Sequence, residues 1–161
     1  MSRADPPNVA RTQPKTRLPN GLPQAAGRTP AHRRATAPVL DMTFRADDLT
    51  RLRSATAAYA VELGAGARTE DVVLIAHELA TNAVKHGGGS GRLRLWRDDF
   101  RLLCRVSDTG PGLADADAAG AELPSVLMPG GRGLWIARCL AALRIDTGPH
   151  GTVITAAVPL R

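Results

Sequence analysis

Three side chains of the segment His77-Glu-Leu-Ala-Thr-Asn-Ala-Val-Lys-His86 have the types and the spacing to do chemistry together. Glu78, Asn82 and Lys85 form one stripe on a helix of about 3.6 residues per turn, because they are four and three residues apart. The stripe offers a base, an oxygen ligand for a hard cation and a positive charge. Taken alone, the helix favours an ordinary solvated polar face. Its opposite face is predicted to be buried and comprises Val72, Val73, Ala76, Leu79, Ala80, Ala83 and Val84.

A zinc helix is the first alternative, because His77-Glu78 begins the pattern His-Glu-x-x-His. Position 81, where the second histidine would stand, is a threonine. His86 lies on the opposite side of a regular helix from His77, so one zinc ion could not bind both. We therefore expect no zinc site, and expect His86 to interact with the last carbonyls of the helix.

Two glycine-rich stretches follow in the sequence. Asp108-Thr-Gly-Pro-Gly112 ends a predicted strand, and its carboxylate could accept an exocyclic amine where glycines let a ligand approach the backbone. The alternative is a plain turn. Pro129-Gly-Gly-Arg-Gly133 opens a predicted helix and would aim unpaired N–H groups at an anion. This stretch is neither a P-loop nor a full Gly-x-Gly-x-x-Gly motif, which disfavours both standard nucleotide folds.

The elements that must position these residues can be read from periodicity and from capping residues. Asp47 or Asp48 could cap the first helix and Thr69 the second, while Gly64, Gly66 and Gly87 end them. The predicted class is α+β: a two-layer sandwich in which helices cover one face of a mixed, mostly antiparallel sheet. The predicted elements are a strand at 39–45, helices at 48–63 and 69–86, strands at 92–97 and 100–108, a helix at 133–143, and strands at 143–147 and 152–160.

Charge divides the chain into two parts. Residues 1–38 carry seven of the basic residues, seven of the 12 prolines and one acid, so they account for the whole net charge of +6. We predict a disordered basic arm at 1–38 and one domain at 39–161. With 3% aromatic residues, base-stacking platforms are not expected. Cys104 and Cys139 are predicted to be reduced core residues, and no apolar run could span a membrane. These features predict a cytoplasmic protein.

Together the three motifs resemble those of the GHKL ATPase superfamily, which includes gyrase and the histidine kinases. HELATNAVKHG (77–87) is similar to its N box, DTGPG (108–112) to its G1 box and GGRGLWIA (130–137) to its G2 box. Residues 113–130 then correspond to the ATP lid. The segments NAVKHG and GRGLWIARCL are most similar to the corresponding motifs of the anti-sigma-factor serine kinases of bacteria. The resemblance covers residues 39–161 and leaves out the arm.

The resemblance implies ATP and Mg²⁺ as cofactors and gives each residue a role. Glu78 would be the catalytic base that takes a proton from a serine hydroxyl, and Asn82 would coordinate Mg²⁺. Asp108 would accept the amino group of adenine, and Lys85 would neutralise phosphate charge. The other implied ATP-binding residues are Gly110, Gly112, Gly131, Arg132, Gly133, Leu134 and Thr152. The predicted lid has no lysine or arginine before Arg132. In this it differs from a lid whose cationic side chains bind the phosphates.

The implied function is that of an ATP-binding anti-sigma factor in transcription regulation. It would sequester a sigma factor and, as a protein serine/threonine kinase, phosphorylate an anti-anti-sigma protein of the STAS type. A homodimer is implied by the resemblance alone. The alternative is a catalytically silent ATP-binding module that acts by protein–protein binding. A histidine kinase is disfavoured, because no dimerisation helices or phosphoacceptor box precede residue 39. Nucleic-acid binding would rest on residues 1–38 alone and is not expected.

Overall fold

The computed structural model describes residues 37, 39–123 and 131–160. Apart from residue 37, the predicted arm 1–38 lies outside the described residues, as do 124–130 of the predicted lid. The described elements follow the predicted order of strand, two helices, two strands, loop, helix and two strands. They are β1 (Leu40–Arg45), α1 (Leu49–Glu62), α2 (Thr69–His86), β2 (Ser90–Arg97), β3 (Arg101–Ser107), α3 (Arg132–Leu140), β4 (Ala142–Gly148) and β5 (Gly151–Pro159), with short 3-10 turns at Ala46–Asp48 and Gly66–Arg68.

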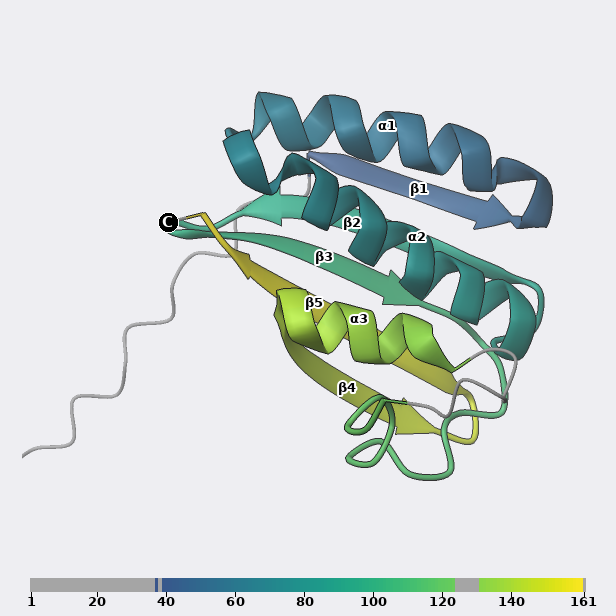
Figure 1. Cartoon of the computed structure of the whole chain (residues 1–161). Helices are drawn as coiled ribbons and strands as arrows, with labels where there is room; N and C mark the ends of the chain where they lie inside the picture. The colour runs from purple at the N-terminus through teal and green to yellow at the C-terminus, as the bar shows by residue number, and fades with distance from the viewer. Residues whose placement is uncertain (1–36, 38, 124–130, 161) are drawn as a thin grey trace, which may run out of the picture. The chain divides into compact units, whose positions relative to one another are not determined.

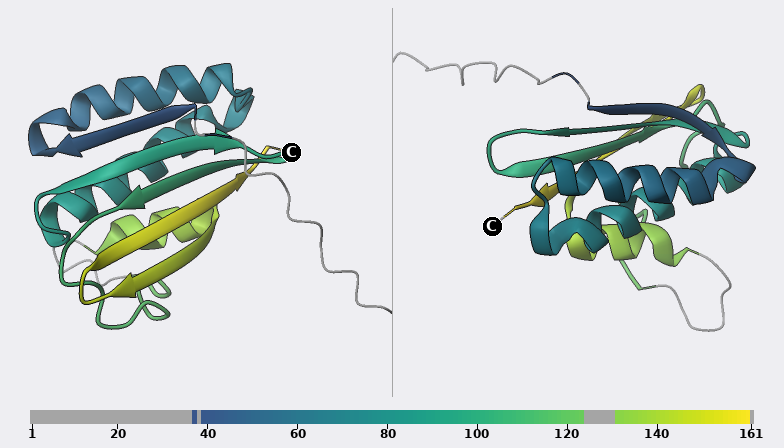
Figure 2. Two further views of the ribbon diagram at one scale, coloured as in Figure 1. Left: turned by 180° about the vertical axis from the view of Figure 1, so that it is seen from behind. Right: turned by 90° about the horizontal axis from the view of Figure 1, so that it is seen from above.

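The five strands form one sheet in the order β1-β2-β3-β5-β4. Every described pairing is antiparallel, so the expectation of a mixed sheet is wrong, while its mostly antiparallel character is confirmed in a stricter form. The three helices cover one face of the sheet, and α2 contacts both α1 and α3 (Figures 1 and 2). The predicted α+β sandwich is therefore confirmed.

The hydrophobic core lies between the sheet and the helices. Alternate strand residues point toward the helices, as period-two alternation requires, and include Leu93 and Leu95 of β2 and Ile154 of β5. The buried face of α2 matches the predicted wheel, except that Val84 is only partly buried and Ile75 is added. Burial in this core raises the pKa of the Cys104 thiol to about 12, because the thiolate would lose its hydration.

Helix boundaries differ from prediction at three places. Thr69 does not cap α2 through its side chain; it follows a 3-10 turn, and its hydroxyl donates to the carbonyl of Gly66. Asp48 precedes α1 but accepts the N–H of Arg45 instead of a backbone N–H of the helix. The third helix ends at Leu140 rather than at 143, because Ala141 is extended and Ala142 already pairs in the sheet.

Among residues 39–123 and 131–160, no helix is long and apolar enough to cross a membrane.

Candidate functional site

Glu78, Asn82 and Lys85 lie on one side of α2, as their spacing predicts. Glu78 and Asn82 are half-buried and Lys85 is exposed. All three border a cavity of about 240 Å³, here named the Lys85 cavity. Its other lining residues are Thr81, His86, Gly131, Arg132 and Gly133. The cavity therefore places two cationic side chains near one carboxylate and one amide.

The beginning of α3 approaches α2 closely at this cavity. Gly131 precedes the helix with φ +79°, a conformation that favours glycine. A Cβ atom built on Gly133 would lie 2.5 Å from Glu78 Oε2 and 3.4 Å from Asn82 Nδ2. Only glycine fits at 133 without a shift of the glutamate. The carboxylate and the amide thus lie at the N-terminus of α3, where helix N–H groups are unpaired.

Asp108 follows β3 and is held by backbone donors. Its Oδ1 accepts the N–H of Gly110 at 3.0 Å and the N–H of Thr152 at 3.2 Å. Its own N–H donates to the carbonyl of Thr152. The second carboxylate oxygen, Oδ2, accepts no hydrogen bond from the residues that the structure describes. The carboxylate is therefore fixed in place while one of its oxygens stays available.

Asp108 borders a second cavity of about 140 Å³, here named the Asp108 cavity. Most of its walls are apolar, with Asp108, Asn82 and Thr152 among the polar contributors. The full lining comprises Leu79, Asn82, Ala83, His86, Gly87, Val106, Asp108, Gly112, Leu113, Gly131, Leu134, Thr152 and Ile154. Asn82, His86 and Gly131 border both cavities, so the two adjoin. A flat, partly apolar group fits the Asp108 cavity and an anionic group fits the Lys85 cavity.

The glycines after Asp108 have different surroundings. Gly110 is buried against the end of α2: a Cβ atom on it would lie 2.6 Å from the Cα of Gly87. It is not one of the residues that line the Asp108 cavity. Gly112 lines the cavity, has φ +83°, and approaches the carbonyl of Gly148 too closely for a side chain. Both positions require glycine, for close approach and for backbone conformation.

Thr147 of β4 was missed by the sequence reasoning. Its Oγ1 lies 3.0 Å from Oγ1 of Thr152 and accepts the N–H of Leu113 at 2.8 Å. A signal was present: Thr147 and Thr152 stand at equal distances from the two-residue turn Pro149-His150, so a tight hairpin places them opposite each other.

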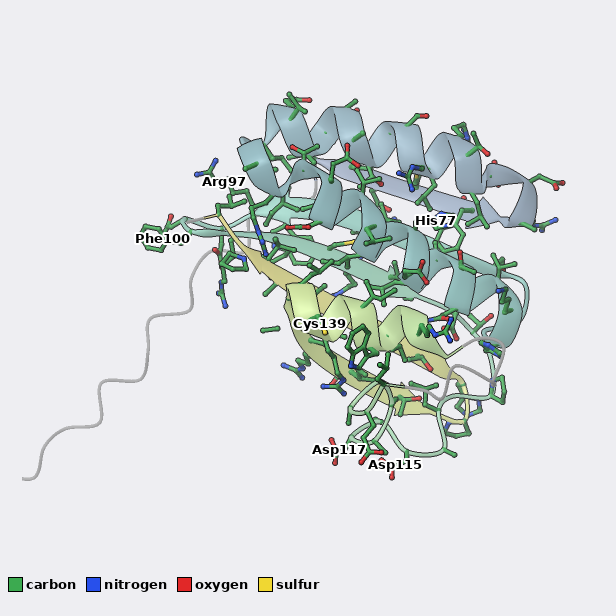
Figure 3. The ribbon with its side chains drawn as sticks, in the orientation of Figure 1. His77, Arg97, Phe100, Asp115, Asp117 and Cys139 are labelled. Carbon is green, nitrogen blue, oxygen red and sulfur yellow. The ribbon has the colours of Figure 1, made fainter. Side chains whose placement is uncertain are left out.

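His77 and His86, both on α2, have different surroundings. His77 lies on α2 (Figure 3), and its Nδ1 is buried without a hydrogen-bond partner in the described part of the chain. His86, which the sequence reasoning placed at the helix end, borders both cavities. Across residues 39–123 and 131–160, no three His, Cys, Asp or Glu side chains form a metal-binding group.

The described part of the predicted lid, residues 113–123, is anchored from α3. Arg138 donates from Nε to the carbonyl of Ala119 at 2.8 Å and from Nη2 to that of Ala116 at 3.2 Å. Asp115, which Figure 3 shows on the loop before α3, accepts the N–H groups of Asp117 and Ala118. Residues 113–123 therefore contain a turn that Asp115 caps and that Arg138 of α3 holds, although they include no lysine or arginine.

Comparison with known protein families identifies the family of this chain. The sequence profile of the histidine kinase-like ATPase domain family matches residues 42–158. Among solved structures, the chain is similar to the histidine kinase domain from the Erythrobacter litoralis EL346 blue-light activated histidine kinase. The TM-score is 0.48 at 23% identity, over 73% of this chain and 68% of that one.

It is also similar to the Acinetobacter baumannii histidine kinase AdeS, with a TM-score of 0.48 at 12% identity, over 78% of this chain and 70% of that one. No curated protein matches the sequence. The matched range includes the segments 77–87, 108–112 and 131–137, which contribute lining residues to the two cavities. The chain belongs to the histidine kinase-like ATPase domain family, within the GHKL group of ATP-binding proteins.

Proposed function

We propose that this protein is an ATP-binding anti-sigma factor with protein-serine kinase activity. Family membership gives the coarser part, an ATPase domain of the GHKL type. The finer part is supported by the side chains at the Lys85 cavity and by the wording of the motifs around them. The protein would sequester a sigma factor in one state and phosphorylate an anti-anti-sigma protein of the STAS type in another.

The two adjoining cavities fit a nucleoside triphosphate. The Asp108 cavity offers an available carboxylate oxygen among apolar walls, which suits a base that carries an exocyclic amine. The Lys85 cavity offers Lys85, Arg132 and the unpaired N–H groups that begin α3, which suit phosphates. The Asn82 side chain borders both and has an amide oxygen, a ligand that Mg²⁺ accepts alongside phosphate oxygens and water. Bound Mg²⁺ would supply charge neutralisation for phosphoryl transfer.

The observation that carries the kinase proposal is the position of Glu78. Its Oε2 would meet a Cβ atom on Gly133 at 2.5 Å, so the carboxylate lies at the N-terminal end of α3, where the proposal puts the phosphates. There Glu78 can take the proton of a serine hydroxyl while the bond from that oxygen to the γ-phosphorus forms and the bond to ADP breaks. Phosphoryl transfer otherwise depends mainly on positioning and charge.

A transfer assay tests the proposal directly. The protein is incubated with Mg-ATP labelled at the γ-phosphate and a cognate anti-anti-sigma protein, and labelled phosphoserine is measured. Glu78→Gln should lower the transfer rate by roughly 10²- to 10⁴-fold and leave ATP binding nearly unchanged. Glu70→Gln, at the exposed first turn of the same helix, is the matched control and should transfer at the wild-type rate.

The outcomes separate the kinase from its alternative. Tight ATP binding without any phosphoprotein would favour the catalytically silent regulatory module. Equal transfer by wild type and Glu78→Gln would remove the base role. Sigma binding is tested separately, by capture of the native sigma factor on the immobilised protein with ADP or ATP. Light scattering of the purified protein in solution tests whether it forms the homodimer that the resemblance implies.

A further inference from the structure

Two threonine hydroxyls connect the Asp108 cavity to the first residue of the lid. Thr147 and Thr152 are paired across the β4–β5 hairpin, with their Oγ1 atoms 3.0 Å apart. Thr147 Oγ1 also accepts the N–H of Leu113 at 2.8 Å. Thr152 is 5% exposed and lines the cavity. A continuous row of polar atoms therefore runs from the backbone of Leu113 to the cavity wall.

Either hydroxyl could donate in the bond between Thr147 and Thr152, because each has one hydrogen and two acceptor lone pairs, whereas the N–H of Leu113 is always a donor. Leu113 donates to Thr147 and occupies one lone pair of its Oγ1, and Thr147 can still donate its own hydrogen. Within the described residues, the acceptor that the structure places beside it is Thr152 Oγ1. When Thr147 donates to Thr152, each hydroxyl polarises the next, and the hydrogen of Thr152 is left for a group inside the cavity.

We infer that Thr147 is a specificity-determining positioning residue, which makes Thr152 a hydrogen-bond donor toward the bound base. Asp108 offers an acceptor close to Thr152. The N–H groups of Gly110 and Thr152 donate to Asp108 Oδ1, and Oδ2 accepts no hydrogen bond from the described residues. A 6-aminopurine presents a ring nitrogen acceptor beside an amine donor and complements this pair. A 6-oxopurine presents a ring N–H beside a carbonyl, the reverse order, and opposes it.

This inference rests on the ATP site of the proposed function but does not depend on kinase activity. Its first test uses the wild-type protein with three Mg-nucleotides of nearly equal size: ATP, inosine triphosphate and purine riboside triphosphate. Dissociation constants are measured by titration calorimetry. ATP should bind at least about tenfold more tightly than inosine triphosphate. Purine riboside triphosphate keeps the ring nitrogen but lacks the amine, so it should fall between them.

The second test removes the hydroxyl that sets the direction. Thr147→Val keeps the shape of the side chain, and we expect the ratio of the inosine triphosphate to the ATP dissociation constant to fall by about fivefold or more. Thr147→Ser should restore the ratio. Thr147→Ala replaces the valine variant if circular dichroism shows that the latter is unfolded. Thr43→Val is the matched control, since Thr43 is an exposed strand residue of β1, and its ratio should equal that of the wild type.

A ratio is the chosen readout because a purely structural role of Thr147 would weaken both nucleotides together. Equal wild-type affinity for ATP and inosine triphosphate would overturn the inference, and so would a wild-type ratio in the variants that lack the hydroxyl. If the wild-type protein binds none of the three nucleotides, the proposed function fails as well. ATP binding without phosphoprotein formation would leave the base-selection result fully interpretable.

Discussion

The carboxylate of Asp108 lies against the backbone of Gly87, at the junction of β3 and α2. A Cβ atom built on Gly87 would lie 2.6 Å from the Cβ of Asp108 and still closer to its carboxylate carbon. Gly87 has φ −100°, a value open to any residue, so the glycine is required by space and not by conformation. The glycine that ends α2 and the carboxylate that borders the Asp108 cavity therefore pack directly against each other.

Replacement of this glycine should disturb the cavity as well as the fold. Gly87→Ala forces Asp108 to move, and we expect the free energy of unfolding to fall by roughly 1–3 kcal/mol, with weaker ATP binding. Urea denaturation and calorimetry measure the two effects. Gly148→Ala is the control, because a Cβ atom there meets nothing within 4 Å. Wild-type ATP affinity in Gly87→Ala would show that Asp108 need not hold this position.

Asp108→Asn should separate binding from folding. Asparagine keeps an oxygen for the N–H groups of Gly110 and Thr152, but places an amide donor where the available oxygen stood. We expect ATP affinity to fall about tenfold or more, with a melting temperature close to that of the wild type. Asp146→Asn, at an exposed surface pair with Arg144, should change neither quantity. Unaltered ATP affinity in Asp108→Asn would contradict the assigned base contact.

The two cysteines should react differently. Burial raises the pKa of Cys104 to about 12 from 9.0. Cys139 is exposed on α3 (Figure 3), so the prediction that it is a core residue is wrong. At pH 8 a thiol reagent should modify Cys139 in the native protein and reach Cys104 only after unfolding. Mass spectrometry of the labelled peptides distinguishes the two sites. Rapid native labelling of Cys104 would show that the core opens locally.

The same thiol makes stability depend on alkaline pH. Above pH 9 the unfolded chain loses the Cys104 proton and the native protein does not, so the native state binds more protons and the free energy of unfolding falls. By pH 10 the loss should reach about 1 to 1.5 kcal/mol. Urea unfolding of Cys104→Ala should lack this component, while Cys139→Ala should retain it. Identical pH slopes in the two variants would exclude Cys104 as the cause.

Arg138 should control the order of the loop before α3. Its guanidinium binds the carbonyls of Ala116 and Ala119, so Arg138→Ala removes two donors from the turn. Because the contact is partly exposed, we expect a loss of only about 1 kcal/mol in global stability. Amide hydrogen exchange at residues 116–121 should become much faster. Arg144→Ala, which removes an exposed arginine paired with Asp146, should leave that exchange unchanged.

Local geometry explains what the sequence allowed us to predict. Glu78, Asn82 and Lys85 share a face because helix geometry alone fixes their relation, and the alternation of β2, β3 and β5 fixes which strand residues are buried. The order of the elements followed from the same patterns. The end of α3 was wrong because the apolar residues after Leu140 fit a helix as well as a strand, and pairing with β5 decides between them.

Contacts between distant segments could not be predicted in this way. The approach of Glu78 to Gly133 depends on how α2 packs against α3. The approach of Gly87 to Asp108 depends on the β2–β3 hairpin, which returns the chain to the end of α2. The contribution of Thr147 needed both the hairpin register and the path of the chain at Leu113. Such relations are set by tertiary packing and leave no periodic signal in the sequence.

The place of β5 in the sheet has a consequence for biosynthesis. β5 lies between β3 and β4, so residues 101–107 keep one edge unpaired until residues 153–159 have been made. The same strand brings Thr152 to Asp108. The proposed base-binding site therefore cannot be complete in a growing chain before β5 is inserted. A chain that stalls before β5 is made exposes the edge of β3 to aggregation.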